Sequence, residues 1–222
     1  MKSHAPATAR NREPILAALR RLLPADARVL EVGSGTGEHA AFFSAAMPAW
    51  TWQPTDPSPA ALASIDAHRR TARATGLLPA VALDARSAGW PPGPFDAVFS
   101  ANVIHIAPWS VCVGLLDGAS RVLAPGGLLL LYGPFRFDGV FLAASNAAFD
   151  ARLRAEDPEW GVRDVAELAR EARARGFAAP LRTELPANNH LLAFRREDAR
   201  SARGGAPDGL VSRAPRPGSS VG

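Results

Sequence analysis

A glycine-rich turn placed directly after a short apolar run is the feature that most constrains this chain. The run Arg28–Val32 is followed by Gly33-Ser34-Gly35-Thr36-Gly37, and an alanine-rich segment of helical character begins at Glu38. Glycine permits a tight turn, and the lack of Cβ atoms lets a ligand approach the backbone closely. The free N–H groups of the following helix can meet polar ligand atoms. The turn therefore predicts a strand, a ligand-binding loop and a helix, in that order.

The rest of the chain alternates between short apolar runs and longer segments of helical periodicity. Strands are expected at 28–32, 50–53, 80–83, 95–100, 128–132, 181–185 and 191–194, and helices at 14–23, 38–47, 58–75, 111–123, 145–155 and 162–175. This alternation is typical of a mainly parallel sheet covered by helices on both faces. The last two strands are joined by too few residues for a helical crossover, so we expect them to be antiparallel neighbours.

The length of 222 residues suits one large domain, and 47% hydrophobic residues allow a buried core. We expect a mobile N-terminal segment at residues 1–10, an α/β domain at 11–196 and a disordered tail at 197–222. The tail is rich in Gly, Ser, Pro, Ala and Arg and has few large apolar side chains. A turn is expected at 125–127, and residues 133–161 are expected to be irregular apart from one short helix.

Composition argues against several classes of protein. Cys112 is the only cysteine, so the sequence offers neither an intramolecular disulfide nor a cysteine-based metal site. The net charge is +4, but acidic and basic residues are well mixed, so no nucleic-acid tail is indicated. No run of about 18 apolar residues could span a bilayer, and the N-terminus lacks the apolar core of a signal peptide. We expect a cytoplasmic protein without a metal; its oligomeric state stays open.

Acidic residues stand where a positively charged nucleoside would need them. Glu31 lies two positions before Gly33, and Asp56 follows the second strand at roughly the 20-residue spacing at which an acid meets ribose hydroxyls. Asp84 follows the third strand, where it could meet adenine or serve as an ordinary turn residue. The carboxylate of Glu31 would be an unfavourable neighbour for a pyrophosphate, because both groups are negatively charged. The spacing G-x-G-x-G also differs from the G-x-G-x-x-G of dinucleotide-binding loops. The pattern favours a cationic sulfonium nucleoside.

Four segments together resemble the class I S-adenosylmethionine-dependent methyltransferases. They are, in the order typical of that class, the loop Glu31–Gly37, the acid Asp56, the segment Phe95–Asn102 and the segment Leu123–Leu131. The resemblance covers about residues 11–196. It implies a Rossmann-like three-layer sandwich with a seven-stranded sheet that contains one antiparallel strand. It also implies S-adenosylmethionine as the cofactor.

A closer resemblance is to an uncharacterised methyltransferase-like family of bacteria and animals, known as a domain of unknown function. The matching residues are Arg10–Ile15, Ser34–Ala40, Trp52–Pro54, Asn102–Ile106, Pro108-Trp109, Tyr132–Phe135, Ser145-Asn146, Phe149-Asp150, Trp160-Gly161, Arg163-Asp164 and Pro186–Asn189. Glu38 departs from the pattern, since glutamine is expected there, and this puts a contact near the methionine moiety in doubt. The family's methyl acceptor is not established, so the resemblance supplies a cofactor but no substrate.

Three residues are candidates for the catalytic step. A sulfonium already activates its methyl group, so the protein mainly aligns donor and acceptor and excludes water. His105 is the leading candidate base because the ordinary pKa of histidine, about 6.5, suits proton transfer near neutral pH. It could equally be a loop histidine bonded to the backbone. Asn102 could orient an acceptor or cap the next segment, and Tyr132 lies at the end of the fifth strand.

Further residues are candidates for binding. Arg12 and Glu13 could form a lid over the cofactor, although Glu13 also suits the start of a helix. Arg136 could bind an anionic group or form a surface ion pair. His39 is expected to be packed rather than catalytic. The candidate cofactor-binding residues are Glu31, Gly33, Ser34, Gly35, Gly37, Asp56, Asp84 and Asn102.

The leading hypothesis is methyl transfer from S-adenosylmethionine to a small-molecule acceptor. One alternative is a catalytically silent cofactor-binding module that works through a protein partner. Another is an RNA or protein methyltransferase, which a basic groove around the site would favour. An NAD-linked oxidoreductase also remains, although the glycine spacing and Glu31 speak against it.

Overall fold

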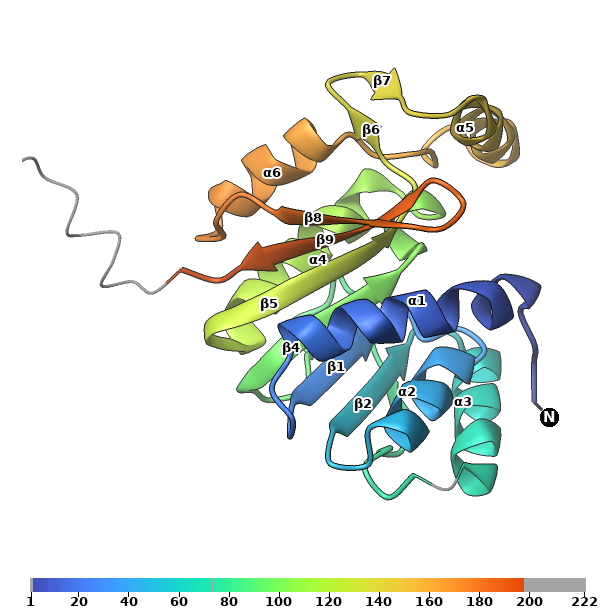
Figure 1. Cartoon of the computed structure of the whole chain (residues 1–222), viewed down its shortest axis with the longest axis vertical. Coiled ribbons are helices and arrows are strands. Elements are labelled where there is room, and N and C mark those ends of the chain that lie inside the picture. Colours follow the sequence, from blue (N-terminus) through green and yellow to red (C-terminus); the bar gives the residue numbers. More distant parts are fainter. Residues whose placement is uncertain (1, 73, 198–222) are drawn as a thin grey trace, which may run out of the picture.

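The computed structural model describes residues 2–72 and 74–197 (Figure 1). The tail expected at residues 197–222 therefore lies outside the described residues, apart from Glu197. The elements are α1 (Pro6–Leu22), β1 (Arg28–Val32), α2 (Glu38–Ala46), β2 (Thr51–Asp56), α3 (Pro59–Thr71), β3 (Val81–Ala82), β4 (Phe95–Ala101), the 3-10 turn η1 (Val103–His105), α4 (Trp109–Val122), β5 (Leu123–Gly133), β6 (Arg136–Phe137), β7 (Val140–Phe141), α5 (Ala144–Glu156), α6 (Val165–Arg173), β8 (Leu181–Leu185) and β9 (Asn189–Arg195).

One seven-stranded sheet, in the order β3-β2-β1-β4-β5-β9-β8, forms the centre of the molecule. The strands from β3 to β5 are parallel, whereas β9 runs antiparallel to both β5 and β8. The expected α/β fold, a mainly parallel sheet with one antiparallel strand, is confirmed. The strand order reverses at β1, so a crevice is expected between the carboxyl ends of β1 and β4.

Helices cover both faces of the sheet (Figure 1). Successive side chains of a strand point to opposite faces, so neighbouring residues join different cores. Val29 packs in the core beneath α1 and α2, together with Ile15 and Phe43. Leu30 packs on the other face, in the core formed with α4 and α6, where Leu115 is fully buried. These two cores hold the sheet rigid, and the loops at its carboxyl edge are free to bind ligands.

The first helix begins at Pro6, whereas the sequence pattern predicts a start at Pro14. Pro6 lies in the first turn, where a missing N–H costs nothing. Pro14 lies inside the helix and removes one hydrogen bond, the one to the carbonyl of exposed Arg10. The segment expected to be mobile thus includes the first turns of α1. It is also bonded to the body of the protein, because the Ala5 N–H donates to Glu38 Oε2 at 2.6 Å.

Other boundaries also differ from the expected ones. Strand β2 continues through Pro54, whose missing N–H faces β3, and β3 pairs with β2 only at Thr55 and Asp56. Strand β5 begins at Leu123, which was expected to end the preceding helix, and it includes residues 125–127, which were expected as a turn. Its register opposite β4 shifts between Phe95 and Ala97. The antiparallel pair β6–β7 lies in the stretch expected to be irregular. Helix α3 ends at Thr71 rather than at Thr75.

Candidate functional site

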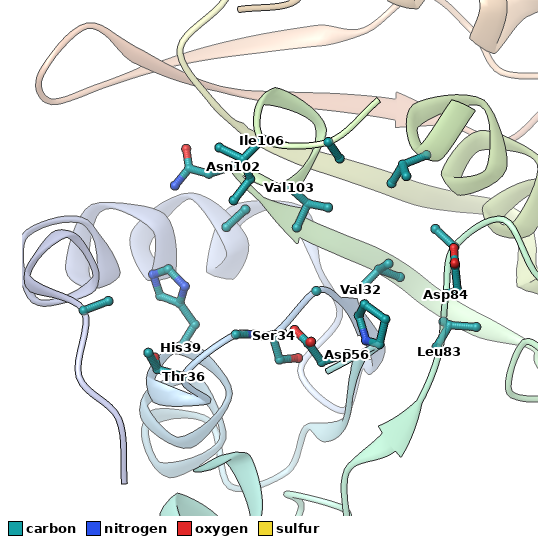
Figure 2. Close-up of a pocket in the computed structure, with 18 of the residues that line it drawn as sticks. Val32, Ser34, Thr36, His39, Asp56, Leu83, Asp84, Asn102, Val103 and Ile106 are labelled. Carbon is teal, nitrogen blue, oxygen red and sulfur yellow. Dashed lines mark hydrogen bonds between the residues drawn. The ribbon is translucent and has the colours of Figure 1, made fainter. Parts of the chain in front are cut away.

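A cavity of about 500 Å³ lies at the carboxyl edge of the sheet, where the strand order reverses (Figure 2). Such crevices are the usual ligand sites of open α/β sheets. The segment from Asn102 to Ile106 forms one side, and the β1–α2 loop with Asp56 forms the other. The wall consists of Ala5, Thr8, Asn11, Val32, Gly33, Ser34, Gly35, Thr36, His39, Asp56, Pro57, Leu83, Asp84, Ala85, Arg86, Ala101, Asn102, Val103, Ile106, Ala107 and Val111.

The glycines of the loop have different roles. Gly35 has φ of +55° and lines the cavity, and a Cβ atom added there would meet nothing within 4 Å. This position therefore leaves backbone open to a ligand. Gly33 also lines the cavity, but a Cβ atom there would collide with Val103. Gly37 was predicted to bind the cofactor, but it lies outside the cavity wall and packs against Ile65 of α3.

Asp56 ends β2 and faces the cavity. Its Oδ2 accepts the Gly35 N–H at 2.9 Å, and its Oδ1 accepts the Ser58 N–H at 2.9 Å. These two bonds fix the carboxylate beside the loop, and its side chain is almost fully buried. Each carboxylate oxygen keeps a second acceptor position. The structure thus places a rigid pair of acceptors where a hydroxyl-bearing ligand would reach them.

Glu31 lies behind the loop and not in the wall of the cavity. Its Oε2 accepts the Ser34 hydroxyl and the Trp52 Nε1–H, each at 2.9 Å. Burial raises the pKa of Glu31 to about 7, against the lowering effect of the Trp52 and Ser34 bonds. Glu31 was predicted to contact a cofactor directly, but it reaches the cavity only through Ser34. Glu31 positions Ser34, and Ser34 lines the cavity.

Asp84 lines the cavity at the end of β3, as expected, but it is already paired. Its Oδ2 accepts Arg86 Nη2 at 2.6 Å, and its Oδ1 accepts Arg86 Nε at 3.0 Å. The hydrogen bonds from Arg86 lower the pKa of the Asp84 carboxyl. The apolar side chain of Leu83 stands close by, and that of Ile106 lines the cavity on the side of Asn102 and Val103. This end of the cavity suits a flat ring with polar groups on its edge.

Asn102 occupies the junction between β4 and η1. Its φ of +63° lies in the left-handed region, which asparagine tolerates better than most residues. Its N–H donates to the Tyr132 carbonyl at 2.8 Å, which ties the junction to β5. Its side chain lines the cavity and also a second, adjoining pocket. Asn102 is therefore placed to contact ligands on both sides.

His105 does not reach the cavity, so the structure corrects its assignment as the base. The η1 turn directs Val103 toward the cavity and His105 into the core, where its ring meets Phe135 at 5.2 Å between centroids. The side chain is fully buried, and neither ring nitrogen has a hydrogen-bond partner among the described residues. Burial lowers the pKa of His105 to about 3. The imidazole stays neutral and away from the site.

Tyr132 is also missing from the wall of the cavity and lines the second pocket instead. Burial raises the pKa of its phenol, although a hydrogen bond with the Asn11 side chain acts in the opposite direction. Tyr132 therefore stays protonated near neutral pH, as a hydrogen-bonding group and not as a base. That Tyr132 takes part in catalysis stays a prediction, with the phenol as a hydrogen-bonding group.

The three residues expected to bind substrate lie outside the cavity. Arg12 stacks its guanidinium on the Phe42 ring, 4.5 Å from the centroid. Glu13 is exposed on α1. Arg136 lies over the Phe141 ring at 5.7 Å. Neither Arg12 nor Glu13 is on the face of α1 that meets the site.

Sequence reasoning missed a polar group that comes from α1 and α2. Thr8 and Asn11 line the cavity, and His39 Nε2 lies 2.8 Å from Asn11 Oδ1. Burial lowers the pKa of His39 to about 4, so its neutral ring donates this bond to Asn11. A signal was present: counting back from buried Ile15 by four and seven positions reaches Asn11 and Thr8, on the same face of the helix.

Neither a metal centre nor a membrane-spanning helix is found in the part of the chain that the structure describes. Within residues 2–72 and 74–197, no cluster of three or more His, Cys, Asp or Glu side chains could hold a metal ion. Within the same residues, no helix combines the length and apolar character that crossing a membrane requires.

Residues 2–196 match the model of a family described as a protein of unknown function, DUF938. The chain belongs to the DUF938 family. The match covers every helix and strand described above, so the fold and cavity of this chain give the DUF938 family a structural description.

Solved structures show which proteins share the DUF938 fold. The chain is similar to the S-adenosylmethionine-dependent methyltransferase SibL in its apo form, with a TM-score of 0.72, 23% identity and 86% of the chain covered. It is also similar to human N-acetylserotonin methyltransferase in complex with SAM, with a TM-score of 0.72, 15% identity and 86% of this chain covered. An O-methyltransferase family protein from Burkholderia thailandensis has a TM-score of 0.72 and 18% identity, with 87% of this chain covered. The aligned region covers 56%, 53% and 58% of these three chains, so this chain spans little more than half of their length.

Proposed function

We propose that this protein transfers a methyl group from S-adenosylmethionine to a small molecule. The observation that carries the proposal is the cavity at the reversal of strand order. There an open glycine backbone at Gly35, the fixed carboxylate of Asp56 and an apolar wall lie together. Parallel α/β sheets bind nucleosides at this place, and the three features correspond to the parts of a nucleoside ligand.

The residues present fit S-adenosylmethionine. Asp56 would accept the ribose hydroxyls, and Leu83 and Ile106 would enclose the adenine ring. Ser34 and His39, from the loop and α2, would face the amino-acid end of the donor. When bound, S-adenosylmethionine would supply a methyl group on a cationic sulfur: the acceptor's lone pair would form the new bond as the methyl–sulfur bond breaks, with S-adenosylhomocysteine as the leaving group.

The contribution of the chain itself is alignment and exclusion of water. His39 is neutral, Asp84 is bonded to Arg86, and Asp56 is held by two backbone N–H groups. His39 and Asp84 therefore do not stand ready as bases of ordinary pKa, and Asp56 is engaged by the backbone of the loop. The side chain of Asn102 lies between the cavity and the next pocket, where it can orient an acceptor. Orientation alone can account for a large part of a rate enhancement.

Two observations favour a small acceptor over a nucleic acid. Arg86 is the one arginine among the described residues of the cavity wall, and it is neutralised by Asp84. A groove that follows a phosphate backbone would need several unpaired basic side chains. In addition, one of the similar structures has a name, N-acetylserotonin methyltransferase, that refers to a small molecule.

Calorimetry with S-adenosylmethionine and S-adenosylhomocysteine tests the proposal. We expect saturable binding of both to the wild-type chain. Asp56→Asn should weaken binding at least about tenfold, because a charge-assisted hydrogen bond contributes about 1.5–3 kcal/mol. Asp26→Asn, which removes the same charge at an exposed loop position, should bind like the wild type.

Absence of binding of either nucleoside to folded wild-type protein would reject the proposal. If both bind, release of S-adenosylhomocysteine in the presence of candidate acceptors is the measure of catalysis. A protein that binds the donor but releases no product with any small molecule would instead support the catalytically silent alternative.

A further inference from the structure

A second pocket, of about 430 Å³, adjoins the proposed donor cavity. It lies between the first turns of α1, the ends of β4 and β5, the start of α5 and the β8–β9 turn. Asn11 and Asn102 line both spaces, so the two pockets meet at these side chains. A molecule in the second pocket would therefore face the donor cavity directly.

The wall of this pocket carries no charged side chain among the described residues. Tyr132 is its one ionisable group, and burial keeps the phenol protonated. A charged ligand would lose part of its hydration there without meeting an opposite charge, which is unfavourable. Two arginines stand just outside this wall: Arg10 lines a smaller neighbouring pocket of about 230 Å³, and the Arg152 guanidinium lies 5.2 Å from the centroid of the Phe149 ring. The inner pocket therefore favours an uncharged molecule.

Asparagine amides supply most of its hydrogen-bonding groups. The five are Asn11, Asn102, Asn146, Asn188 and Asn189. Asn146 donates from Nδ2 to the Asn188 carbonyl at 3.1 Å, which leaves its Oδ1 as an acceptor. Asn189 likewise uses Nδ2 on the carbonyls of Pro186 and Ala187 and leaves its Oδ1. The side-chain amide of Asn102 makes no hydrogen bond among the described residues, so it offers both a donor and an acceptor.

Flat apolar surfaces complete the pocket. Phe149, half-buried on α5, and Pro134, after β5, line it together with Tyr132. Aromatic rings stack on or meet such surfaces edge to face, with a gain beyond the buried area. The volume is within the range of pockets that hold compact small molecules. A ring compound with polar groups on its edge would use both the apolar surfaces and the amides.

We propose that this pocket holds the methyl acceptor, and that the acceptor is an uncharged ring compound with a hydrogen-bond donor and an acceptor on its edge. The proposal rests on the proposed function for its link to methyl transfer. Because no charged side chain among the described residues lines the pocket, the acceptor would attack with a lone pair that it already carries. The new bond would form as the methyl–sulfur bond breaks, the positive charge would pass from the sulfonium to the methylated product, and any proton that the product sheds would go to solvent. The acceptor is thus selected by neutral polarity and flatness, not by charge.

Benzamide, benzoate and benzamidine test the selection, because they share size and shape but differ in charge. Each would be added at millimolar concentration to the full chain saturated with S-adenosylhomocysteine, and binding would be measured by ligand-observed NMR. We expect benzamide to bind at least about threefold more tightly than either ion, since an uncompensated charge loses solvation. Equal binding of all three, or preference for an ion, would overturn the proposal.

A variant that adds one charge to the pocket tests whether the three probes bind there. Asn188 has φ of +56°, a conformation that aspartate also tolerates, so Asn188→Asp keeps the backbone and adds one negative charge to the pocket. We expect this variant to raise the affinity of benzamidine about threefold and to lower that of benzoate, as for a partly exposed charge pair. Ala151→Asp adds the same charge on an exposed position of α5 away from the pocket and should change neither affinity.

The outcomes separate this inference from the proposed function. If S-adenosylhomocysteine does not bind, the proposed function fails first. If it binds but the Asn188→Asp variant leaves the preference among the three probes unchanged, the donor site stands and the assignment of the second pocket is wrong.

Discussion

Glu31, buried behind the glycine loop, makes the stability of the folded protein depend on pH. Burial raises its pKa from 4.5 to about 7, while Trp52 and Ser34 act in the opposite direction. In the unfolded chain this carboxyl would lose its proton near the ordinary value. A folded-state pKa above the unfolded one stabilises the protein at low pH. This contribution is complete below about pH 4.5 and is lost as the pH rises through about 7.

Replacing Glu31 with Gln should remove this dependence. A shift from 4.5 to about 7 corresponds to as much as about 3 kcal/mol of unfolding free energy. We therefore expect Glu31→Gln to gain stability relative to the wild type between about pH 5 and about pH 8 in urea unfolding. Exposed Glu13→Gln serves as the control and should follow the wild type. Parallel pH profiles for Glu31→Gln and the wild type would refute the expectation.

The site residues that could be predicted are those set by local sequence. Asp56 and Gly35 follow directly from a strand end and a glycine turn, and both line the cavity. His105 could not be placed, because the direction of a three-residue 3-10 turn decides whether it faces solvent or core. Asn11 and Arg12 are neighbours in sequence, but a helix turns about 100° between them. One therefore reaches the cavity, while the other stacks on Phe42.

At the scale of elements, the segment leading into α1 is joined to α2 and α3. Glu38 accepts the Ala5 N–H through Oε2 and meets His4 Nδ1 through Oε1 at 2.8 Å. The Ser3 N–H donates to Ser64 Oγ at 2.8 Å. Burial raises the pKa of Glu38, but the bonds from Ala5, His4 and Thr36 outweigh it and leave the pKa lowered. The sequence departure at Glu38 thus concerns this attachment, and not a residue in the wall of the donor cavity.

Loosening the attachment should weaken donor binding, because Ala5, Thr8 and Asn11 line the cavity. We expect Glu38→Ala to lower the affinity for S-adenosylhomocysteine about fivefold, in line with about 1 kcal/mol for a lost hydrogen bond. Stopped-flow measurements should assign most of the loss to faster dissociation. Glu13→Ala, at an exposed position of α1, should have no effect. An unchanged dissociation rate in Glu38→Ala would show that the attachment does not contribute to donor binding.

Elements with a strong pattern could be predicted, and short or interrupted ones could not. The strand Leu181–Leu185 was expected with its exact bounds, because alternation and flanking prolines mark it. The sequence pattern predicts too short a helix α1 because a proline such as Pro14 is typical of a helix start. In the structure, Pro14 lies in the interior of the helix, which tolerates it. Strands β6 and β7 have two residues each, which is too short for any periodicity to show.

At the scale of the whole molecule, the donor should stabilise the folded state. A ligand that binds only the folded state, present at 100 times its dissociation constant, adds about 2.7 kcal/mol. For a chain of this size, we expect the unfolding midpoint to rise by roughly 5–10 °C with S-adenosylhomocysteine, measured by differential scanning fluorimetry. Adenosine, which lacks the amino-acid part, should give a smaller rise. A midpoint that stays constant at saturating S-adenosylhomocysteine would contradict donor binding.

The mainly parallel sheet with one antiparallel strand could be inferred because the alternation of elements leaves few ways to build the sheet. The second pocket could not be inferred in this way. Its wall brings together segments as distant as Asn11, Tyr132 and Asn189, and no local pattern records that they meet. Only the folding of α1 and α5 over the edge of the sheet creates that space.

The sharing of Asn11 and Asn102 between the two pockets has an evolutionary consequence. A substitution at either residue would disturb both chambers at once and should be strongly selected against. Substitutions on α5 or in the β8–β9 turn would alter one chamber only. Related chains could therefore acquire new acceptors through those two segments while they inherit the donor chamber intact.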